Sequence, residues 1–279
     1  MRLVLTLLVR DERDVIRANV AYHLSLGVDA VVVTDNGSVD GTRDVLADLA
    51  REAPVTVIDE PAQDYAQSAW VTRMARLAAE DGADWVVNAD ADEFWTPLEG
   101  GLPDALARVD PDAGGVVCPR VNMRSLRGAT GSFAERMRFR DELSHHAQGA
   151  RIGSKVAHRA APDVVVAMGN HAVESAHLGP VSAQELIEVL HFPHRSLEHM
   201  TQAVRNGAES LMANPALGPE AGWHWRRLYE QLQSGELGAV YDRTLLSAAE
   251  LEVGASQGLF REDRRVRDRL ETLGLLQDG

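Results

Sequence analysis

Four short, nearly continuous apolar runs in the first third of the chain constrain its fold more than any other feature. They cover residues 3–9, 30–34, 55–59 and 85–88, and segments with helical spacing of apolar residues separate them. Unbroken apolar strands are typical of a parallel sheet that is covered on both faces. Because strand and helix alternate, we expect parallel βαβ units with right-handed crossovers. The pattern therefore predicts an α/β fold with a mostly parallel central sheet flanked by helices.

Helix signals fill the gaps between these runs. We expect helices over residues 15–26, over a segment with Ser38 or Asp40 as its N-cap, and over residues 66–78. Shorter β-like runs follow at residues 116–121, 164–168 and 186–192, and helical spacing returns at residues 200–211, 223–232 and 261–275. Without a long linker, we expect one catalytic domain over residues 1–195 and a helical C-terminal region over residues 196–279 that packs on it.

The net charge of the chain limits the classes of ligand that it is expected to bind. The chain has 279 residues, and its 28 Lys+Arg against 42 Asp+Glu give a net charge of −14. Such a surface repels DNA, RNA and anionic lipid headgroups, so we expect no nucleic-acid partner. A phosphate ligand must therefore be met by a local arrangement of residues.

The chain also carries few signals for export or disulfide bonding. Cys118 is its only cysteine, which excludes an intrachain disulfide and favours a reducing compartment. The apolar run at residues 3–9 lacks a cleavage site, and no apolar stretch approaches the ~20 residues that span a bilayer. We expect no transmembrane segment and a cytoplasmic location.

The sequence lacks the motifs of several common enzyme classes. Lys155 is the only lysine, and it lies in neither a phosphate-binding Gly-Lys-Ser/Thr loop nor a Ser-x-x-Lys motif. The dinucleotide-binding, nucleophile-elbow and His-Glu-x-x-His motifs are absent as well. Nucleotide hydrolases of the phosphate-loop type, dinucleotide enzymes, serine hydrolases and zincins are therefore disfavoured.

Acidic residues follow two of the apolar runs directly. Asp90 and Asp92 end the fourth run, and residues two apart in an extended chain point to the same side. Clustered carboxylates repel one another unless a cation lies among them, and oxygen ligands favour Mg²⁺ or Mn²⁺. The alternative is an acidic turn that caps the next helix. Because parallel strands end at one sheet edge, where ligands bind, the strand context favours a metal site.

A second acidic segment follows the second run. Asp35 is able to accept hydrogen bonds from a base or ribose, whereas residues 36–40 have the composition of a turn and helix cap. Arg10, at the end of the first run, converges on the same edge.

With these motifs in order, the sequence resembles the glycosyltransferase family 2-like enzymes, which have the GT-A nucleotide-sugar-binding fold. The resemblance rests on residues 8–12, 35–42, 67–70 and 90–94, and more weakly on residues 135–136, 155–159, 169–171 and 191–196. It implies transfer of a sugar from a nucleoside diphosphate sugar, with a UDP-sugar favoured, to an acceptor hydroxyl. It also implies a nucleotide-sugar-binding half over residues 1–95 and an acceptor- and metal-completing half over residues 96–195.

The resemblance further implies site residues. Asp92 and His191 are the expected ligands of Mn²⁺ or Mg²⁺, and Asp92 and Glu135 are the expected catalytic residues. The expected donor-binding residues are Leu7, Val9, Arg10, Glu12, Asp35, Asn36, Arg73, Asp90 and Ala91. Arg10 and Arg73 are candidates for a contact to the diphosphate, although an ordinary surface position is slightly favoured for each.

Two assignments stay open. His171 and His194 compete with His191 as the third metal ligand, because imidazole is a competent ligand in any of these positions. If the sugar is transferred with inversion, a carboxylate must accept the acceptor proton. The competitors of Glu135 for that role are Asp141, Glu142 and Asp163.

Other functions and contacts compete with this interpretation. A nucleotidyltransferase also gathers acidic residues around a metal, but it normally has a glycine-rich loop after the first strand, where residues 7–12 contain no glycine. A non-catalytic nucleotide-sugar-binding protein is the other alternative. Trp223 and Trp225 either line an acceptor groove or dock a helix. The charged segment 261–269 is a solvated helix face or a homodimer contact.

Overall fold

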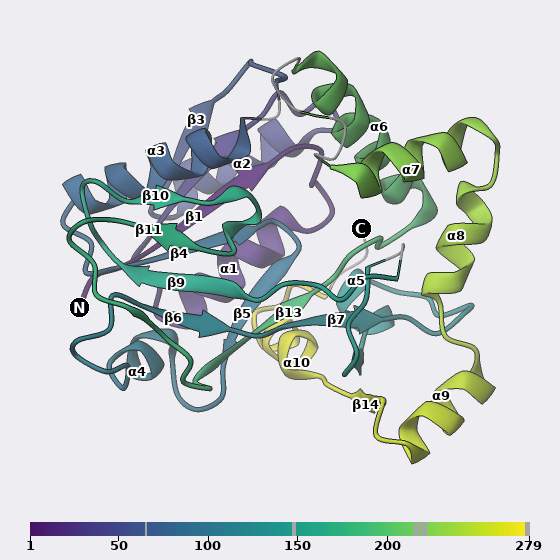
Figure 1. Cartoon of the computed structure of the whole chain (residues 1–279). Coiled ribbons are helices and arrows are strands. Elements are labelled where there is room, and N and C mark those ends of the chain that lie inside the picture. Colours follow the sequence, from purple (N-terminus) through teal and green to yellow (C-terminus); the bar gives the residue numbers. More distant parts are fainter. Residues whose placement is uncertain (65, 147–148, 215–217, 219–221, 277–279) are drawn as a thin grey trace. The chain divides into compact units, whose positions relative to one another are not determined.

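The computed structural model describes residues 1–64, 66–146, 149–214, 218 and 222–276 (Figure 1). The chain forms two compact units, which we describe separately. The first unit consists of Met1–Pro61, Ala66–Arg120 and Gly153–His191, and the second of Ala62–Tyr65, Val121–Ile152 and Phe192–Gly279. This grouping differs from the expected division at residue 195, because the segment 121–152 belongs with the C-terminal helices.

A seven-stranded sheet forms the centre of the first unit, with the strand order β12-β6-β9-β4-β1-β2-β3. Its strands are β1 (Leu3–Val9), β2 (Ala30–Asp35), β3 (Val55–Asp59), β4 (Trp85–Asp90), β6 (Gly115–Cys118), β9 (Lys155–Arg159) and β12 (Val181–Ser182). All four predicted strands of the first third are confirmed. Strand β9 is antiparallel to both β4 and β6, whereas the other neighbours are parallel. The sheet is therefore mixed, with a parallel majority.

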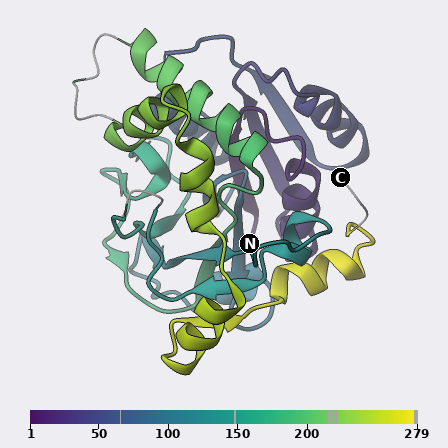
Figure 2. The same cartoon turned by 90° about the vertical axis from the view of Figure 1, so that its right-hand side faces the viewer.

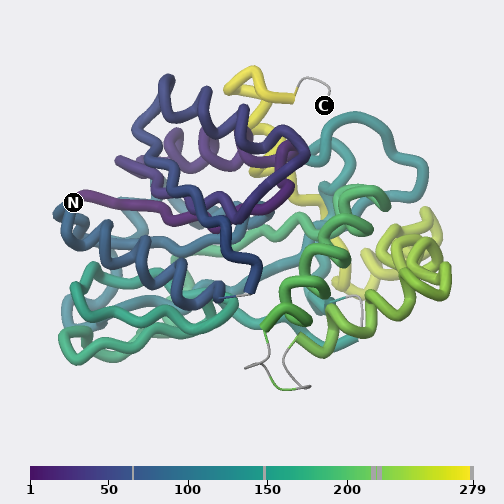
Figure 3. The backbone as a smooth tube through the Cα atoms, turned by 90° about the horizontal axis from the view of Figure 1, so that it is seen from above, coloured from purple at the N-terminus to yellow at the C-terminus, as the bar shows by residue number. Residues whose placement is uncertain are grey.

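The three long helices of the first unit cover both faces of this sheet. They are α1 (Ile16–Ser25), α2 (Thr42–Glu52) and α3 (Gln67–Glu80). After β3 the chain crosses back, so that β4 pairs with β1 on the side away from β2. A right-handed crossover in this reversed direction places its helix on the opposite face of the sheet. Figure 3 shows α1 and α2 on one face and α3 on the other. The strand order reverses between β1 and β4, and ligands of such sheets bind at that reversal, beyond the carboxyl ends of the strands.

Helix α3 seals one face of the sheet through an apolar stripe. Val71, Met74 and Ala78 recur at helical spacing and pack against Val4 of β1 and Val86 of β4. All five side chains are buried. This packing holds α3 against the two strands that carry the ends of β1 and β4.

The start of α2 differs from the prediction. Its N-cap is Gly41, at φ +98°, rather than Ser38 or Asp40. The side chain of Asp40 accepts the N–H of Thr42 at 2.9 Å, and Ser38 Oγ accepts the N–H of Asp11 at 2.9 Å. The two residues expected as N-caps therefore form loop hydrogen bonds instead. The left-handed backbone at residue 41 suits glycine, which has no Cβ to clash.

Smaller elements complete the first unit. They are β5 (Glu93–Pro97), which pairs antiparallel with β13 (Ile187–His191), the helix α4 (Leu102–Leu106), the strands β10 (Val165–Val166) and β11 (Val173–Glu174), and a 3₁₀ turn at Met168–Asn170. The run predicted at 116–121 is divided at Pro119, which has no N–H to donate. Its second part begins β7 (Arg120–Arg124).

The second unit is mainly helical. The strands β7, β8 (Phe139–Asp141) and β14 (Phe260–Glu262) pair antiparallel. Its helices are α5 (Phe133–Arg136), α6 (Leu197–Ala213), α7 (Trp223–Gln233), α8 (Leu237–Thr244), α9 (Ala248–Ser256) and α10 (Arg265–Thr272) (Figure 2). The prediction of a helix over 261–275 is wrong at its start, because residues 260–262 pair with β8. Within the described ranges, none of the helices is both long and apolar enough to cross a membrane.

Candidate active site

Three strand ends meet at the sheet edge beside the reversal of strand order. In the register of the sheet, Val9 of β1 lies opposite Asp35 of β2, and Leu8 of β1 lies opposite Asp90 of β4. The expected donor-binding segments after these strands therefore share one edge. Leu7 and Val9 themselves are core side chains, almost completely buried, so a donor reaches only their backbone.

Asp35 is buried at this edge with an unsatisfied oxygen. Its side chain is 2% exposed, and its Oδ1 lies 3.4 Å from the N–H of Ser38. Its Oδ2 accepts no hydrogen bond from the described residues, although Arg43 Nε lies 3.5 Å away. A buried carboxylate oxygen without a hydrogen bond is costly, so this atom is suited to a donor group supplied by a ligand.

The loops after β1 and β2 are fastened to each other. Asp11, at φ +57°, accepts the N–H of Val39 at 2.7 Å through Oδ1. The N–H of Glu12 donates to Thr42 Oγ1 at 2.9 Å, and the N–H of Asn36 donates to the carbonyl of Val9, also at 2.9 Å. These bonds tie the two loops together beside Asp35.

The two candidate arginines differ in their surroundings. Arg73 lies on α3, and its Nη1 is 3.0 Å from Glu60 Oε2. Its side chain is partly exposed and already carries a counter-charge, which fits the surface interpretation. Arg10 is half-buried immediately after β1.

Asp90 ends β4 within a network of polar side chains. Its Oδ2 accepts a hydrogen bond from Lys155 Nζ at 2.7 Å. Its Oδ1 lies 3.4 Å from both Gln67 Nε2 and Asn170 Nδ2. Asn170 is buried at φ +59°, and its Oδ1 has no hydrogen-bond partner within the described part of the chain.

Glu93 belongs to the same network and is completely buried. Its Oε1 lies 2.8 Å from Lys155 Nζ and 3.0 Å from Arg120 Nη1, and its Oε2 accepts the N–H of Asp90 at 3.2 Å. Burial alone would lower the pKa of Lys155, but the carboxylates of Asp90 and Glu93 outweigh it and raise that pKa. Lys155 is therefore charged.

The sequence assigned no role to Lys155 or Arg120. The available signal was that the only lysine of the chain stands at the head of the segment Lys155–Arg159, and lysine is rarely fully buried. It could not be joined to Asp90, because 65 residues separate the two in sequence.

Asp92 and His191 are brought together. Asp92 lies in the turn between β4 and β5, and His191 ends β13 opposite Glu93. The distance from His191 Nε2 to Asp92 Oδ2 is 3.3 Å, and both side chains are partly exposed. They offer one imidazole and one carboxylate, the start of a cation site. Among the described residues no group of three or more His, Cys, Asp or Glu is placed to hold a metal.

The competing histidines differ in their surroundings. His171 is exposed and its Nδ1 donates to the carbonyl of Ser154 at 2.7 Å. His194 belongs to the second unit and adopts φ +51°. His191 is the candidate for which the structure gives a close approach to Asp92, at 3.3 Å.

Helix α1 supports the turn that carries Asp92. Asn19 Nδ2 donates to the carbonyls of Ala91 and Glu93, at 2.9 Å each. His23 Nε2 accepts the N–H of Trp95 at 3.0 Å, and its Nδ1 donates to the carbonyl of Asn19 at 2.8 Å. Burial lowers the pKa of His23 to about 4, so its ring is neutral and fixed in one tautomer.

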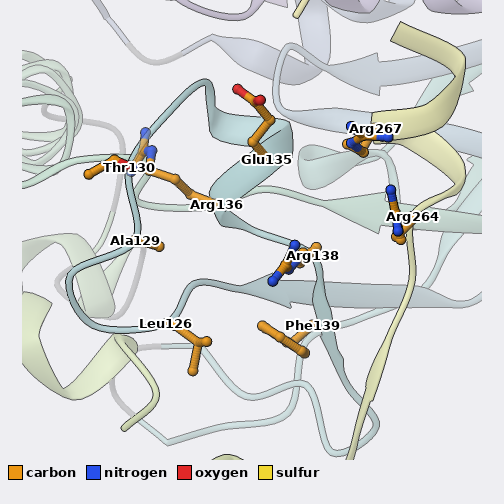
Figure 4. Close-up of a pocket in the computed structure, with 9 residues that line it drawn as sticks. All are labelled: Leu126, Ala129, Thr130, Glu135, Arg136, Arg138, Phe139, Arg264 and Arg267. Carbon is orange, nitrogen blue, oxygen red and sulfur yellow. The ribbon is translucent and has the colours of Figure 1, made fainter. Parts of the chain in front are cut away.

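Glu135, in the second unit, is engaged as a helix cap. Its Oε2 accepts hydrogen bonds from the N–H and the Oγ–H of Ser132, both at 2.8 Å, and these bonds lower its pKa. A lowered pKa makes a carboxylate a weaker base. Glu135 lines a pocket of about 280 Å³ together with four arginines (Figure 4). These are Arg136, Arg138, Arg264 and Arg267.

The alternative bases also have partners. Asp141 pairs with Arg124 Nη1 at 2.9 Å, and Glu142 pairs with Arg140 Nε at 2.9 Å. A hydrogen bond from the hydroxyl of Ser175 lowers the pKa of Asp163.

The two tryptophans of α7 have different surroundings. Trp225 packs over Gly207 of α6, where an added Cβ would approach the indole to 2.8 Å, so it docks α7. Trp223 is 43% exposed, with its ring centroid 5.4 Å from that of His146.

Comparison with known families gives a match over more than half of the chain. The family model described as "Glycosyl transferase family 2" matches residues 10–163. The succinoglycan biosynthesis protein ExoA of Rhizobium meliloti (strain 1021) is 35% identical over 127 residues. That alignment covers 43% of this chain and 36% of ExoA, so the chain matches only about a third of that relative's length.

Solved structures show a distant likeness. The S. aureus TarS fragment 1–349 has a TM-score of 0.45 and 14% identity, covering 88% of this chain and 81% of that chain. The same fragment in complex with UDP-GlcNAc has a TM-score of 0.43 and 11% identity, covering 98% of this chain and 92% of that chain.

Proposed function

Because this chain belongs to glycosyl transferase family 2, we propose that it transfers a sugar from a nucleoside diphosphate sugar to an acceptor hydroxyl. Its fold is the GT-A fold of this family. The observation that carries the proposal is the sheet edge on which Asp35, Asp90 and Asp92 follow two strands that flank β1. The family match favours a glycosyltransferase over the nucleotidyltransferase alternative.

Unsatisfied polar atoms at this edge support donor binding. Asp35 Oδ2 and Asn170 Oδ1 are buried oxygens without a hydrogen bond within the described residues. Each gains stability if a ligand supplies an N–H or O–H, because an unsatisfied buried acceptor costs about 1–3 kcal/mol. We assign Asp35 to the base and Asp90 to the ribose, with a UDP-sugar as the first donor to test.

The residues present fit a divalent cation. Asp92 Oδ2 and His191 Nε2 would hold Mn²⁺ or Mg²⁺, which commonly binds through one or two protein side chains and substrate phosphates. When bound, the ion supplies positive charge for the diphosphate that leaves as the glycosidic bond breaks. A chain with a net charge of −14 has particular need of such a local cation.

The chain's own residues position the rest. Asn19 holds the carbonyls on both sides of Asp92, and so orients its carboxylate toward His191. For an inverting transfer we keep Glu135 as the proposed base. Its engagement in the α5 cap requires that the Ser132 bonds weaken when an acceptor arrives.

The test is release of nucleoside diphosphate from a panel of UDP-, GDP- and dTDP-sugars, with Mn²⁺ or with EDTA. Water serves as the acceptor for slow turnover until the natural acceptor is identified. We expect Asp92→Ala to lower the rate about 100-fold or more, because the cation loses its carboxylate ligand. Asp48→Ala is the matched control, since Asp48 is an exposed acid on α2. Full activity of Asp92→Ala would refute the metal assignment.

A further inference from the structure

Arginine side chains surround the pocket of the second unit. The pocket measures about 280 Å³, and its lining includes Arg136, Arg138, Arg264 and Arg267 together with one acid, Glu135. Figure 4 shows that the first two arginines come from the end of α5 and the segment after it, whereas the other two come from the start of α10. The lining therefore carries four positive charges and one negative charge, in a chain whose net charge is −14.

Two of these arginines have guanidinium nitrogens that the protein does not use. Arg138 Nε lies 3.3 Å from an oxygen of Glu262, and Arg264 Nε lies 3.4 Å from an oxygen of Asp268. Within the described ranges, the Nη1 and Nη2 atoms of both arginines donate no hydrogen bond to a protein acceptor. Because a guanidinium has five N–H donors, a contact at Nε leaves the Nη groups for a ligand.

Arg136 is oriented by backbone carbonyls rather than by an acid. Its Nε donates to the carbonyl of Gly131 at 2.9 Å, and its Nη1 donates to the carbonyl of Arg195 at 2.8 Å. In the part of the chain that the structure describes, no carboxylate forms an ion pair with Arg136. Its positive charge is therefore held in a fixed place and is not neutralised by a partner.

The acids that pair with the other three arginines are weak competitors for a ligand. Glu262 is 44% exposed, and Asp268 and Glu271, which both pair with Arg267, are each 56% exposed. Exposed ion pairs contribute little to stability because water screens them. An anion that enters the pocket is therefore able to compete with these acids.

The position of α10 adds to the attraction for an anion. Arg264 is the N-cap of this helix, and Arg267 lies in its first turn. A helix N-terminus carries partial positive charge, so cations there are unfavourable and an anion beside them is favourable. An anion in the pocket would compensate both the arginines and the helix terminus.

Phosphate matches this arrangement better than a carboxylate does. Guanidinium groups bind both kinds of oxyanion through paired hydrogen bonds. Arginines that approach from two separate segments, however, require an anion that accepts hydrogen bonds from several directions. A phosphate monoester offers three strong acceptor oxygens and close to two negative charges.

We propose that this pocket binds a phosphate group, either free or carried by a saccharide, through Arg136, Arg138 and Arg264. All of these residues belong to the second unit, whereas the strand ends of the candidate sheet edge belong to the first. The inference is independent of the proposed function. It assigns a role to the charged segment at the start of α10.

Isothermal titration calorimetry of the full-length protein with inorganic phosphate, in the presence of EDTA, tests the site. We expect a Kd of about 1 mM or lower. Arg138→Gln and Arg264→Gln should each weaken binding about tenfold, because each removes charged hydrogen-bond donors. Both side chains are exposed, so both variants should fold, as circular dichroism would verify. Arg261→Gln is the matched control, since Arg261 pairs with Glu142 in the same unit and does not line the pocket.

A hexose phosphate distinguishes the two sources of the phosphate group. Binding about tenfold tighter than that of inorganic phosphate would identify a phosphorylated saccharide as the ligand, and equal binding would identify free phosphate. Absence of binding at about 10 mM phosphate, or unchanged affinity in both arginine variants, would overturn the inference.

Titration with UDP and Mn²⁺ separates this site from the donor site. UDP should bind Arg264→Gln as tightly as it binds the unmodified protein. A tenfold loss in the variant would assign the arginine to the donor site and overturn the inference. If UDP does not bind the unmodified protein, the proposed function fails, while the phosphate titrations still decide the inference.

Discussion

Buried neutral histidines make the first unit sensitive to acid. His23 and His158 are fully buried, and desolvation lowers the pKa of each to about 4. His158 Nε2 accepts a hydrogen bond from Asn88 Nδ2 at 2.9 Å, and its Nδ1 donates to the carbonyl of Arg159 at 2.8 Å. Both rings therefore serve as fixed hydrogen-bond bridges in their neutral form.

This environment predicts a pH dependence of stability. The unfolded chain binds a proton at each histidine below about pH 6.5, whereas the folded chain resists protonation until about pH 4. The free energy of unfolding should therefore fall as pH decreases from 7 to 5, on the order of 2 kcal/mol for each histidine. Urea unfolding at the two pH values measures the fall. His23→Gln should remove part of it, and an unchanged fall would contradict the assignment.

At this scale the sequence predicts the acidic residues of the site but not their partners. Asp35, Asp90 and Asp92 were identified because each follows an apolar strand, a local signal. Lys155 reaches Asp90 and Glu93 because β9 pairs antiparallel with β4. Arg120, the first residue of β7, reaches Glu93. Such pairings are non-local and leave no periodic pattern in the chain.

Among the elements, α3 supports the Asp90 side of the candidate site, as α1 supports the turn with Asp92. It packs on β1 and β4 through an apolar stripe and contributes Gln67 to the Asp90 network. Loss of packing in this stripe should therefore affect stability and the edge together.

Truncation in this stripe should be costly. Met74 is completely buried in the cluster between α3 and the sheet. Met74→Ala should lower the free energy of unfolding by about 2–5 kcal/mol, because it removes apolar contacts and leaves a cavity. Leu77→Ala on the same helix is the control, since Leu77 is 40% exposed, and it should cost less than about 1 kcal/mol. Equal losses in urea unfolding would show that α3 does not pack as described.

The sequence predicted helices and strands correctly where the apolar pattern is local. It failed where pairing with a distant strand decides the structure. The strands β1 to β3 coincide with their apolar runs almost residue for residue. The start of α10 was placed too early because residues 260–262 form β14, whose partner β8 lies about 120 residues earlier. The apolar spacing that indicates a helix lies within the helix itself, whereas a short edge strand forms only if a distant strand pairs with it.

For the whole molecule, the segment that the family model matches contains the strand ends of the candidate sheet edge. The match spans residues 10–163, which include every strand end that carries Asp35, Asp90 and Asp92. The helices α6 to α10 lie beyond it. The grouping of residues 121–152 with these helices was not predictable, because it arises from the β8–β14 pairing rather than from any linker in the sequence.

The most direct test of a nucleotide-sugar-binding edge is a thermal-shift panel of UDP-, GDP- and dTDP-sugars, each with and without Mn²⁺. A ligand at 100 times its Kd stabilises the native state by about 2.7 kcal/mol, which raises the Tm by roughly 5–10 °C. We predict such a rise for a UDP-sugar with Mn²⁺ and little change with Mn²⁺ alone. If none of the nucleotide sugars shifts the Tm under either condition, the central claim is contradicted.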